Sequence, residues 1–136
     1  MKKYVSIDIG GTAIKYGLIG ADGMIISRSE TPTQAEKGGP SILEKAITIT
    51  DRFDQDHEIA GICISTAGIV NTKKGMIQHA APLIPNYTGV CFKEPMEKRF
   101  GVPCEVENDV NCAGLAEYLT GAGKECDPML MLTDGT

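Results

Sequence analysis

The sequence predicts an α/β fold with a mixed sheet, in which a meander of three strands is followed by helices that alternate with strands. Three observations lead to this prediction. Short alternating apolar runs come first, later segments space their apolar residues as amphipathic helices do, and residues 59–64 form a nearly continuous apolar run. Such a run is typical of a parallel strand with both faces covered. The 136 residues, 42% of them hydrophobic, suffice for one compact domain with a core.

The first part of the chain predicts an antiparallel meander. Its strands are expected at residues 3–9, 13–19 and 23–29. The pair Gly10-Gly11 joins the first two strands and predicts a tight hairpin. Residues 20–23 (GADG) separate the last two strands, and residues 31–33 (TPT) end the meander.

Helices and strands then alternate. The first helix is expected to have Ser41 as its N-cap, with Glu44 three residues later, and to reach about Asp56. The strand at 59–64 leads into a small-residue loop, residues 65–68, and residues 75–89 are expected to hold a short hairpin and a surface loop.

A second helix is expected over residues 92–100, closed by Gly101 and Pro103. The last predicted elements are a strand at 104–107, a helix at 110–120 and a strand at 128–133. We expect one lobe over residues 1–121, followed at 122–136 by a linker and the first strand of another lobe.

The net charge, the hydropathy and the cysteines indicate which classes of protein this chain does not belong to. The net charge of −5 argues against a nucleic-acid surface, and no apolar stretch is long enough to span a bilayer. The five cysteines are odd in number and have no C-x-x-C spacing, which predicts reduced thiols in a cytoplasmic protein. Cys63 and Cys104 fall in strand-like runs and are expected in the core.

The first hairpin turn is a candidate phosphate site. Glycines at such a turn tolerate positive φ, and their amides can cradle an anion. Asp8 ends the preceding strand, where a carboxylate can hold Mg²⁺ beside a phosphate. The alternative is an ordinary Gly-Gly hairpin with a solvated Asp8.

Three motifs together resemble the N-terminal lobe of ROK-family sugar kinases. They are residues 8–12 (DIGGT), 65–70 (STAGIV) and 107–117 (ENDVNCAGLAE). The family includes glucokinases, β-glucoside kinases, N-acetylmannosamine kinases and sugar-responsive repressors. The resemblance implies a ribonuclease-H-like, actin-like ATPase lobe, which agrees with the predicted order of elements.

The resemblance also implies roles on the nucleotide side. Asp8 helps to place Mg²⁺, and Gly10, Gly11 and Thr12 face the phosphates of ATP through backbone and hydroxyl donors. Lys15 is either a further phosphate ligand or a solvated strand residue.

On the sugar side, Asp109 is implied as the catalytic base, which accepts the proton of the attacking hydroxyl. From its position alone, Asp109 is also a good helix N-cap. Asn108, Gly68 and Asn86 resemble sugar-contacting positions. Tyr87 either stacks on a sugar or fills the core of its loop.

The chain departs from the family pattern at its end. Residues 133–136 (TDGT) match only the start of a second phosphate motif, and the family's zinc motif and second lobe have no counterpart here. We therefore expect this chain alone to be an inactive or poor kinase and to self-associate. Repressors of the family carry a DNA-binding segment ahead of the DIGGT motif, which begins here at residue 8. We therefore expect a sugar kinase rather than a non-catalytic sugar-binding module, acting on a hexose, glucoside or amino sugar at O6.

Overall fold

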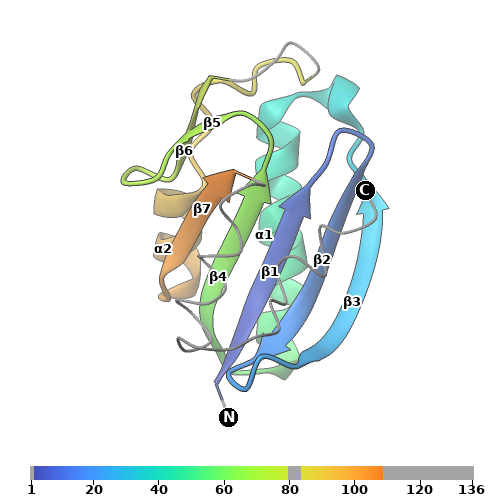
Figure 1. Ribbon diagram of the computed structural model, residues 1–136, viewed down its shortest axis with the longest axis vertical. Coiled ribbons are helices and arrows are strands. Elements are labelled where there is room, and N and C mark those ends of the chain that lie inside the picture. Colours follow the sequence, from blue (N-terminus) through green and yellow to red (C-terminus); the bar gives the residue numbers. More distant parts are fainter. Residues whose placement is uncertain (1, 80–83, 109–136) are drawn as a thin grey trace.

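The computed structural model describes residues 2–79 and 84–108, which build a five-stranded mixed sheet of order β3-β2-β1-β4-β7 (Figure 1). Its strands are β1 (Lys3–Ile9), β2 (Ala13–Gly20), β3 (Ile25–Pro32), β4 (Ile59–Thr66) and β7 (Cys104–Asn108). β1, β2 and β3 pair antiparallel, whereas β4 pairs parallel with β1 and with β7. The predicted α/β class and mixed sheet are confirmed. The helix expected at 110–120 and the strand expected at 128–133 lie outside the described residues.

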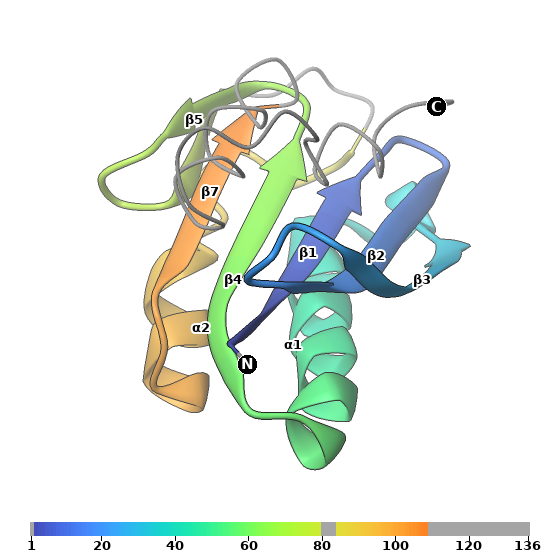
Figure 2. The ribbon, with the colours of Figure 1, turned by 60° about the horizontal axis from the view of Figure 1, so that its bottom comes forward.

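Two helices lie against the same face of this sheet (Figures 1 and 2). They are α1 (Gly39–Asp56) and α2 (Lys93–Phe100), and a short 3-10 helix, η1 (Ala35–Lys37), precedes α1. A small hairpin of β5 (Ile69–Asn71) and β6 (Met76–His79) follows β4. α2 ends as the sequence predicted, because Gly101 adopts a left-handed conformation and donates its N–H to the Glu97 carbonyl.

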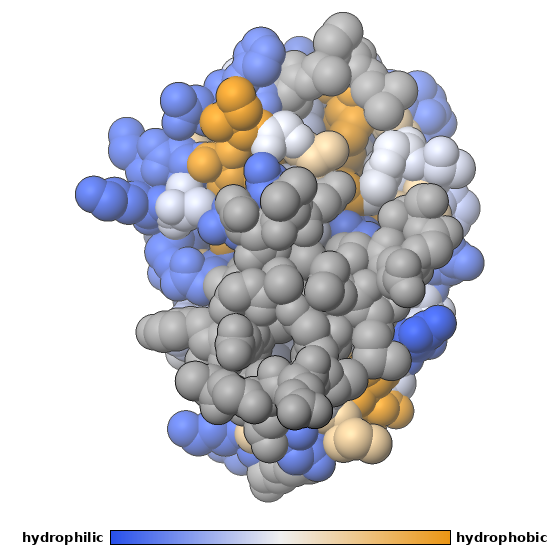
Figure 3. All heavy atoms as spheres, viewed as in Figure 1, coloured by the Kyte–Doolittle hydropathy of each residue, from blue (hydrophilic) through white to orange (hydrophobic). Residues whose placement is uncertain are grey.

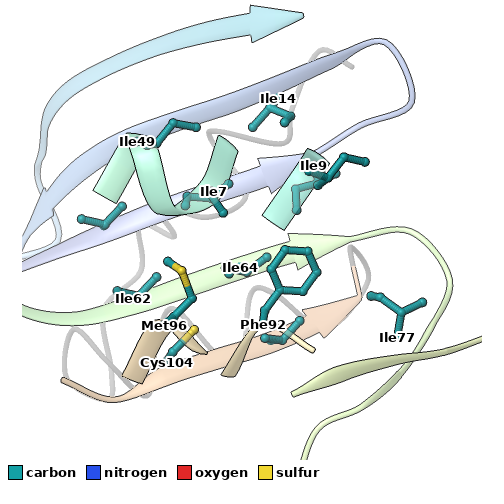
Figure 4. Close-up of a cluster of buried hydrophobic side chains, with 14 of the residues drawn as sticks. Ile7, Ile9, Ile14, Ile49, Ile62, Ile64, Ile77, Phe92, Met96 and Cys104 are labelled. Atoms are coloured by element: carbon teal, nitrogen blue, oxygen red, sulfur yellow. The ribbon is translucent and has the colours of Figure 1, made fainter. Parts of the chain in front are cut away.

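The core fills the space between the sheet and the two helices (Figure 4). Side chains from β1 and β4 meet those of α1 and α2, and the largest fully buried ones include Ile7, Ile64, Phe92 and Met96. Cys63 and Cys104 are both buried, as expected. The packing of these buried side chains fixes the position of the sheet edge at which β1, β4 and β7 end.

Three predicted boundaries were wrong. α1 begins at Gly39 with Gly38 as its N-cap, and Ser41 makes no capping hydrogen bond. Pro40 explains the shift, since proline fits the first turn of a helix. β3 extends through Pro32, which an edge strand tolerates. The short hairpin lies at 69–79 and not within 75–89.

The face seen in Figure 3 is mostly hydrophilic over its coloured part, with smaller hydrophobic patches. Exposed large apolar side chains in the described residues are Met24, Ile26 and Ile69. No helix in the part of the chain that the structure describes is long and apolar enough to cross a membrane.

Candidate functional site

A row of polar residues crosses the sheet near the ends of β1, β4 and β7. Backbone pairing aligns them in the order Glu30, Lys15, Asp8, Ser65 and Glu107, one from each strand. Directly paired residues project from the same face of a sheet, so these five side chains share one face. Their chain neighbours alternate to the other face, where the core lies.

The row lies near the edge of the sheet that is formed by the carboxyl ends of the parallel strands. The arrowheads of β1, β4 and β7 point to one edge, where the β1–β2 turn also lies (Figures 1 and 2). Ligands of open α/β sheets collect at the carboxyl ends of strands. Asp8 is only 4% exposed and Ser65 is fully buried. The fold therefore places Asp8 in a sheltered position at the edge suited to a ligand.

The turn that connects β1 to β2, residues 10–12, is called the phosphate turn below, after the role that the resemblance implies. Gly10 does not adopt positive φ, contrary to the reason the sequence suggested for it. Its N–H donates to the Ala13 carbonyl at 3.0 Å, and a Cβ on Gly10 would lie 2.8 Å from that oxygen. Glycine is therefore required by the tightness of the turn. The Gly10 N–H is occupied within the turn, so Gly10 provides space rather than a donor.

The other two residues of the phosphate turn present donors. Gly11 and Thr12 are exposed, and their N–H groups donate no hydrogen bond within the part of the chain that the structure describes. The Thr12 hydroxyl adds a third donor at the same place. Outward-facing amides at a turn form a concavity suited to an anion.

The phosphate turn is held from behind by Thr33, a residue that the sequence marked only as the end of the meander. The Thr33 hydroxyl donates to the Gly10 carbonyl at 2.7 Å, and the Thr33 N–H donates to the Thr12 carbonyl at 2.9 Å. Thr33 is fully buried. No local sequence signal identifies this role, because the two segments are more than twenty residues apart.

Lys15 lies between two carboxylates in the polar row, with Asp8 on one side and Glu30 on the other. It is half-buried, and the ion pairs found among the described residues do not include it. The register therefore places Lys15 beside Asp8, a few residues beyond the phosphate turn, and no ion pair joins it to another residue that the structure describes.

The residues expected on the sugar side come from two loops. Gly68 follows β4 with a φ of 104°, and Asn86 is exposed with a φ of 56°. We call residues 84–87 the sugar loop. Tyr87 in this loop is 2% exposed and its hydroxyl lies 2.7 Å from the Thr66 hydroxyl. Its ring meets that of Phe92 edge-on at 6.2 Å. Tyr87 thus fills the loop core and presents no open ring for stacking on a sugar.

The end of β7 brings the last motif to the same edge. Asn108 pairs with Thr66, and Glu107 pairs with Ser65. Asp109, the expected catalytic base, follows Asn108 in the chain and lies outside the described residues. Glu107 was part of the recognised motif but received no role from the sequence. The strand register brings it into the row of Asp8.

The donor set suits a magnesium ion bound mainly by phosphate oxygens and water. Among the residues described, no group of three or more His, Cys, Asp and Glu side chains could form a metal cage. Mg²⁺ typically uses one or two carboxylates together with substrate phosphates and water. Asp8 beside the phosphate turn fits that requirement.

Comparison with known proteins identifies the family. Residues 4–136 match the ROK family. The chain is 51% identical over 136 residues to a protein of Clostridium perfringens, with 100% of this chain and 46% of that protein covered. It is 35% identical over 134 residues to a β-glucoside kinase of Listeria monocytogenes, with 98% and 44% covered.

A solved structure agrees with these sequence matches. The ROK family glucokinase from Streptomyces griseus, in complex with glucose and AMPPNP, superposes with a TM-score of 0.71 at 30% identity. The match covers 90% of this chain and 38% of the glucokinase. The chain thus spans less than half the length of these relatives. Because the family match extends over nearly the whole sequence, this chain belongs to the ROK family.

Proposed function

We propose that this chain is the N-terminal lobe of an ATP-dependent sugar kinase, with the lobe itself formed by residues 1–121. The acceptor is a hexose, a glucoside or an amino sugar, phosphorylated at O6. The observation that carries the proposal is the juxtaposition at one sheet edge of the phosphate turn, the buried Asp8 and the end of β7. Phosphoryl transfer requires a phosphate cradle, a metal-binding carboxylate and a base beside the acceptor.

On the nucleotide side, the amides of Gly11 and Thr12 and the Thr12 hydroxyl bind the phosphates of ATP, and Gly10 lets the turn close. Lys15 contributes a positive charge from the polar row. Asp8 holds Mg²⁺, directly or through water. When bound, Mg²⁺ neutralises the charge that develops on the phosphate oxygens.

On the sugar side, Gly68, Asn86 and Asn108 bind the acceptor. The Asp109 carboxylate accepts the proton of the sugar hydroxyl as its oxygen forms a bond to the γ-phosphorus and the bond to the β-phosphate oxygen breaks, which releases ADP. The position of Asn108 at the end of β7, paired with the end of β4, supports this arrangement.

A coupled ATP-turnover assay tests the proposal. The chain is assayed alone and after fusion to the C-terminal half of the β-glucoside kinase of L. monocytogenes, with hexoses, glucosides and N-acetylhexosamines as acceptors. Transition-state stabilisation needs both sides of a cleft, so we expect turnover from the fusion and little from the chain alone.

The matched control is Asp109→Asn in the same fusion, which keeps the side-chain size and removes the base. We expect it to abolish sugar-dependent turnover. Sugar binding without turnover in the unmodified fusion would instead indicate a non-catalytic sugar-binding module. Equal turnover by the fusion and its Asp109→Asn variant would remove Asp109 from the mechanism.

A further inference from the structure

We propose that residues 33–39, here called the strap, hold the phosphate turn and the sugar loop in one rigid frame. Thr33 is the positioning residue at one end and Gly39 is the positioning residue at the other. The identification of the two held segments as nucleotide and sugar sites rests on the function proposed above. The strap contacts themselves are independent of that function.

At its first end, the strap fixes the phosphate turn through two hydrogen bonds. Thr33 donates its hydroxyl to the Gly10 carbonyl at 2.7 Å and its N–H to the Thr12 carbonyl at 2.9 Å. These bonds occupy the carbonyls of the turn on the side of Thr33. A fully buried threonine that donates to a turn carbonyl resists displacement, because breaking the bond leaves a desolvated acceptor.

At its other end, the strap fixes the sugar loop by close backbone approach. The Gly39 N–H donates to the Pro85 carbonyl at 2.8 Å. A Cβ on Gly39 would collide with the Asn86 carbonyl oxygen, so only glycine allows this contact. Gly38, with a φ of 88°, turns the chain into α1 directly beside the same loop. Asn86 is therefore held by its neighbours on the strap side.

Between its ends, the strap is fixed by hydrogen bonds within it and to α1. Its 3-10 turn is closed by hydrogen bonds from Lys37 to the Gln34 carbonyl and from Gly38 to the Ala35 carbonyl, both at 2.9 Å. The Lys45 ammonium, from α1, donates to the Gln34 side-chain oxygen at 2.7 Å and also bonds the Pro32 carbonyl at 2.8 Å. These bonds limit how far one end of the strap moves without the other.

The contacts form a closed circuit at one edge of the sheet. The sugar loop returns to β4 through the Tyr87 and Thr66 hydroxyls, 2.7 Å apart, and Thr66 is paired with Ile9 next to the phosphate turn. Figure 1 shows the start of α1 at the same edge as the β1–β2 turn. In this frame, Tyr87 is a second positioning residue for the sugar loop.

Residue-resolved amide hydrogen exchange of the chain tests the strap. Thr33→Val removes the hydroxyl donor and keeps the shape. Thr50→Val is the matched control, because Thr50 is also fully buried and its hydroxyl donates to the Ala46 carbonyl at 2.9 Å, but within α1. The probes are the amides of Gly10 at the phosphate turn and of Gly39 at the sugar loop. The amide of Ile62, which bonds the Pro103 carbonyl, reports global opening.

We expect Thr33→Val to speed exchange at Gly10 about fivefold and to speed exchange at Gly39 as well, relative to Ile62, while Thr50→Val does neither. Acceleration at Gly10 without any at Gly39 would overturn the coupling through the strap. If exchange became faster by the same factor at Gly10, Gly39 and Ile62, Thr33 would only stabilise the fold as a whole. Its assignment as a positioning residue would then be overturned.

Two further variants keep the test decisive if Thr33→Val fails to fold. Thr33→Ser restores the donor and is expected to exchange as the unmodified chain does. Tyr87→Phe loosens the circuit from the sugar side and is expected to speed exchange at Gly39 and then at Gly10. If Tyr87→Phe leaves Gly10 unchanged, the two segments are not held in one frame.

In the active fusion, Thr33→Val is expected to raise the KM for ATP about fivefold to tenfold with a smaller change in the KM for sugar, and Thr33→Ser to reverse the effect. A fusion without kinase activity would refute the proposed function and leave the exchange result standing. An active fusion in which Thr33→Val and Thr50→Val have the same KM for ATP would refute the strap.

Discussion

The two faces of β1 and β4 differ in chemistry although both are buried. Ile7 and Ile64 point into the core between the sheet and the helices, while their chain neighbours Asp8 and Ser65 belong to the polar row on the opposite face. Ile64 and Ser65 are both fully buried. Burial alone therefore does not distinguish the face that stabilises the fold from the face that carries the candidate site.

The difference lies in what each face requires of its side chains. The apolar face gains free energy in proportion to the surface removed from water. A buried polar group gains nothing from burial itself and needs a partner. In each strand, the residues that face the helices thus provide stability, and the residues that alternate with them provide the polar groups of the candidate site. Substitutions on the two faces are expected to separate these effects.

Ile64→Ala tests the apolar face. It removes a fully buried side chain of the core cluster between the sheet and the helices, and we expect it to lower the free energy of unfolding by about 2–5 kcal/mol. Urea unfolding of the chain measures the change, with the exposed Ile26 of β3 replaced by alanine as the control. A loss below about 1 kcal/mol, as seen for ordinary surface substitutions, would mean that the core relaxes around the site.

Asp8→Asn tests the polar face, at the residue pair next to that of Ile64. The amide keeps the shape but removes the charge that is proposed to hold Mg²⁺, so we expect sugar-dependent turnover of the fused kinase to fall about 100-fold or more. The free energy of unfolding is expected to change less than in Ile64→Ala. Turnover near that of the unmodified fusion would exclude Asp8 from the nucleotide site.

Most of the fold could be predicted because its signals are local. Alternating apolar residues marked β1 and β2, the continuous apolar run marked β4, and Gly101 marked the end of α2. The motif residues that the structure describes also come together at one sheet edge, since they occur where paired strands end. These features depend on residues that are neighbours in the sequence.

The remaining features depend on contacts between distant segments. The start of α1 contacts a distant loop, because the Gly39 N–H donates to the Pro85 carbonyl. The choice for Tyr87 between sugar stacking and loop packing was settled by Thr66 and Phe92, which lie elsewhere in the chain. Thr33 gave no signal at all. Contacts of this kind cannot be predicted from local sequence patterns, because they form only when distant segments meet in the folded chain.

The rim of the apolar face, where α2 meets β7, carries ion pairs beside its apolar contacts. Glu97 accepts one hydrogen bond from the Cys104 N–H at 2.9 Å and forms an ion pair with Lys93 at 3.1 Å. Burial alone would raise the pKa of Glu97, but these two donors outweigh it and lower the pKa. Lys93 also contacts Glu105 at 3.2 Å, and although burial would lower the pKa of Lys93, its two carboxylate partners raise it.

Glu97→Gln tests whether this rim adds stability through its charge. Because the folded pKa of Glu97 is lowered, its contribution is complete above about pH 5 and is lost as the pH falls through the folded pKa. We expect the substitution to cost about 1 kcal/mol at pH 7, reduced by partial exposure, and to cost progressively less in acid. Urea midpoints at several pH values measure this, with the exposed Glu94→Gln in the same helix as the control. If both variants lose stability in acid as steeply as the unmodified chain, the Glu97 contact at the rim depends on its shape and not on its charge.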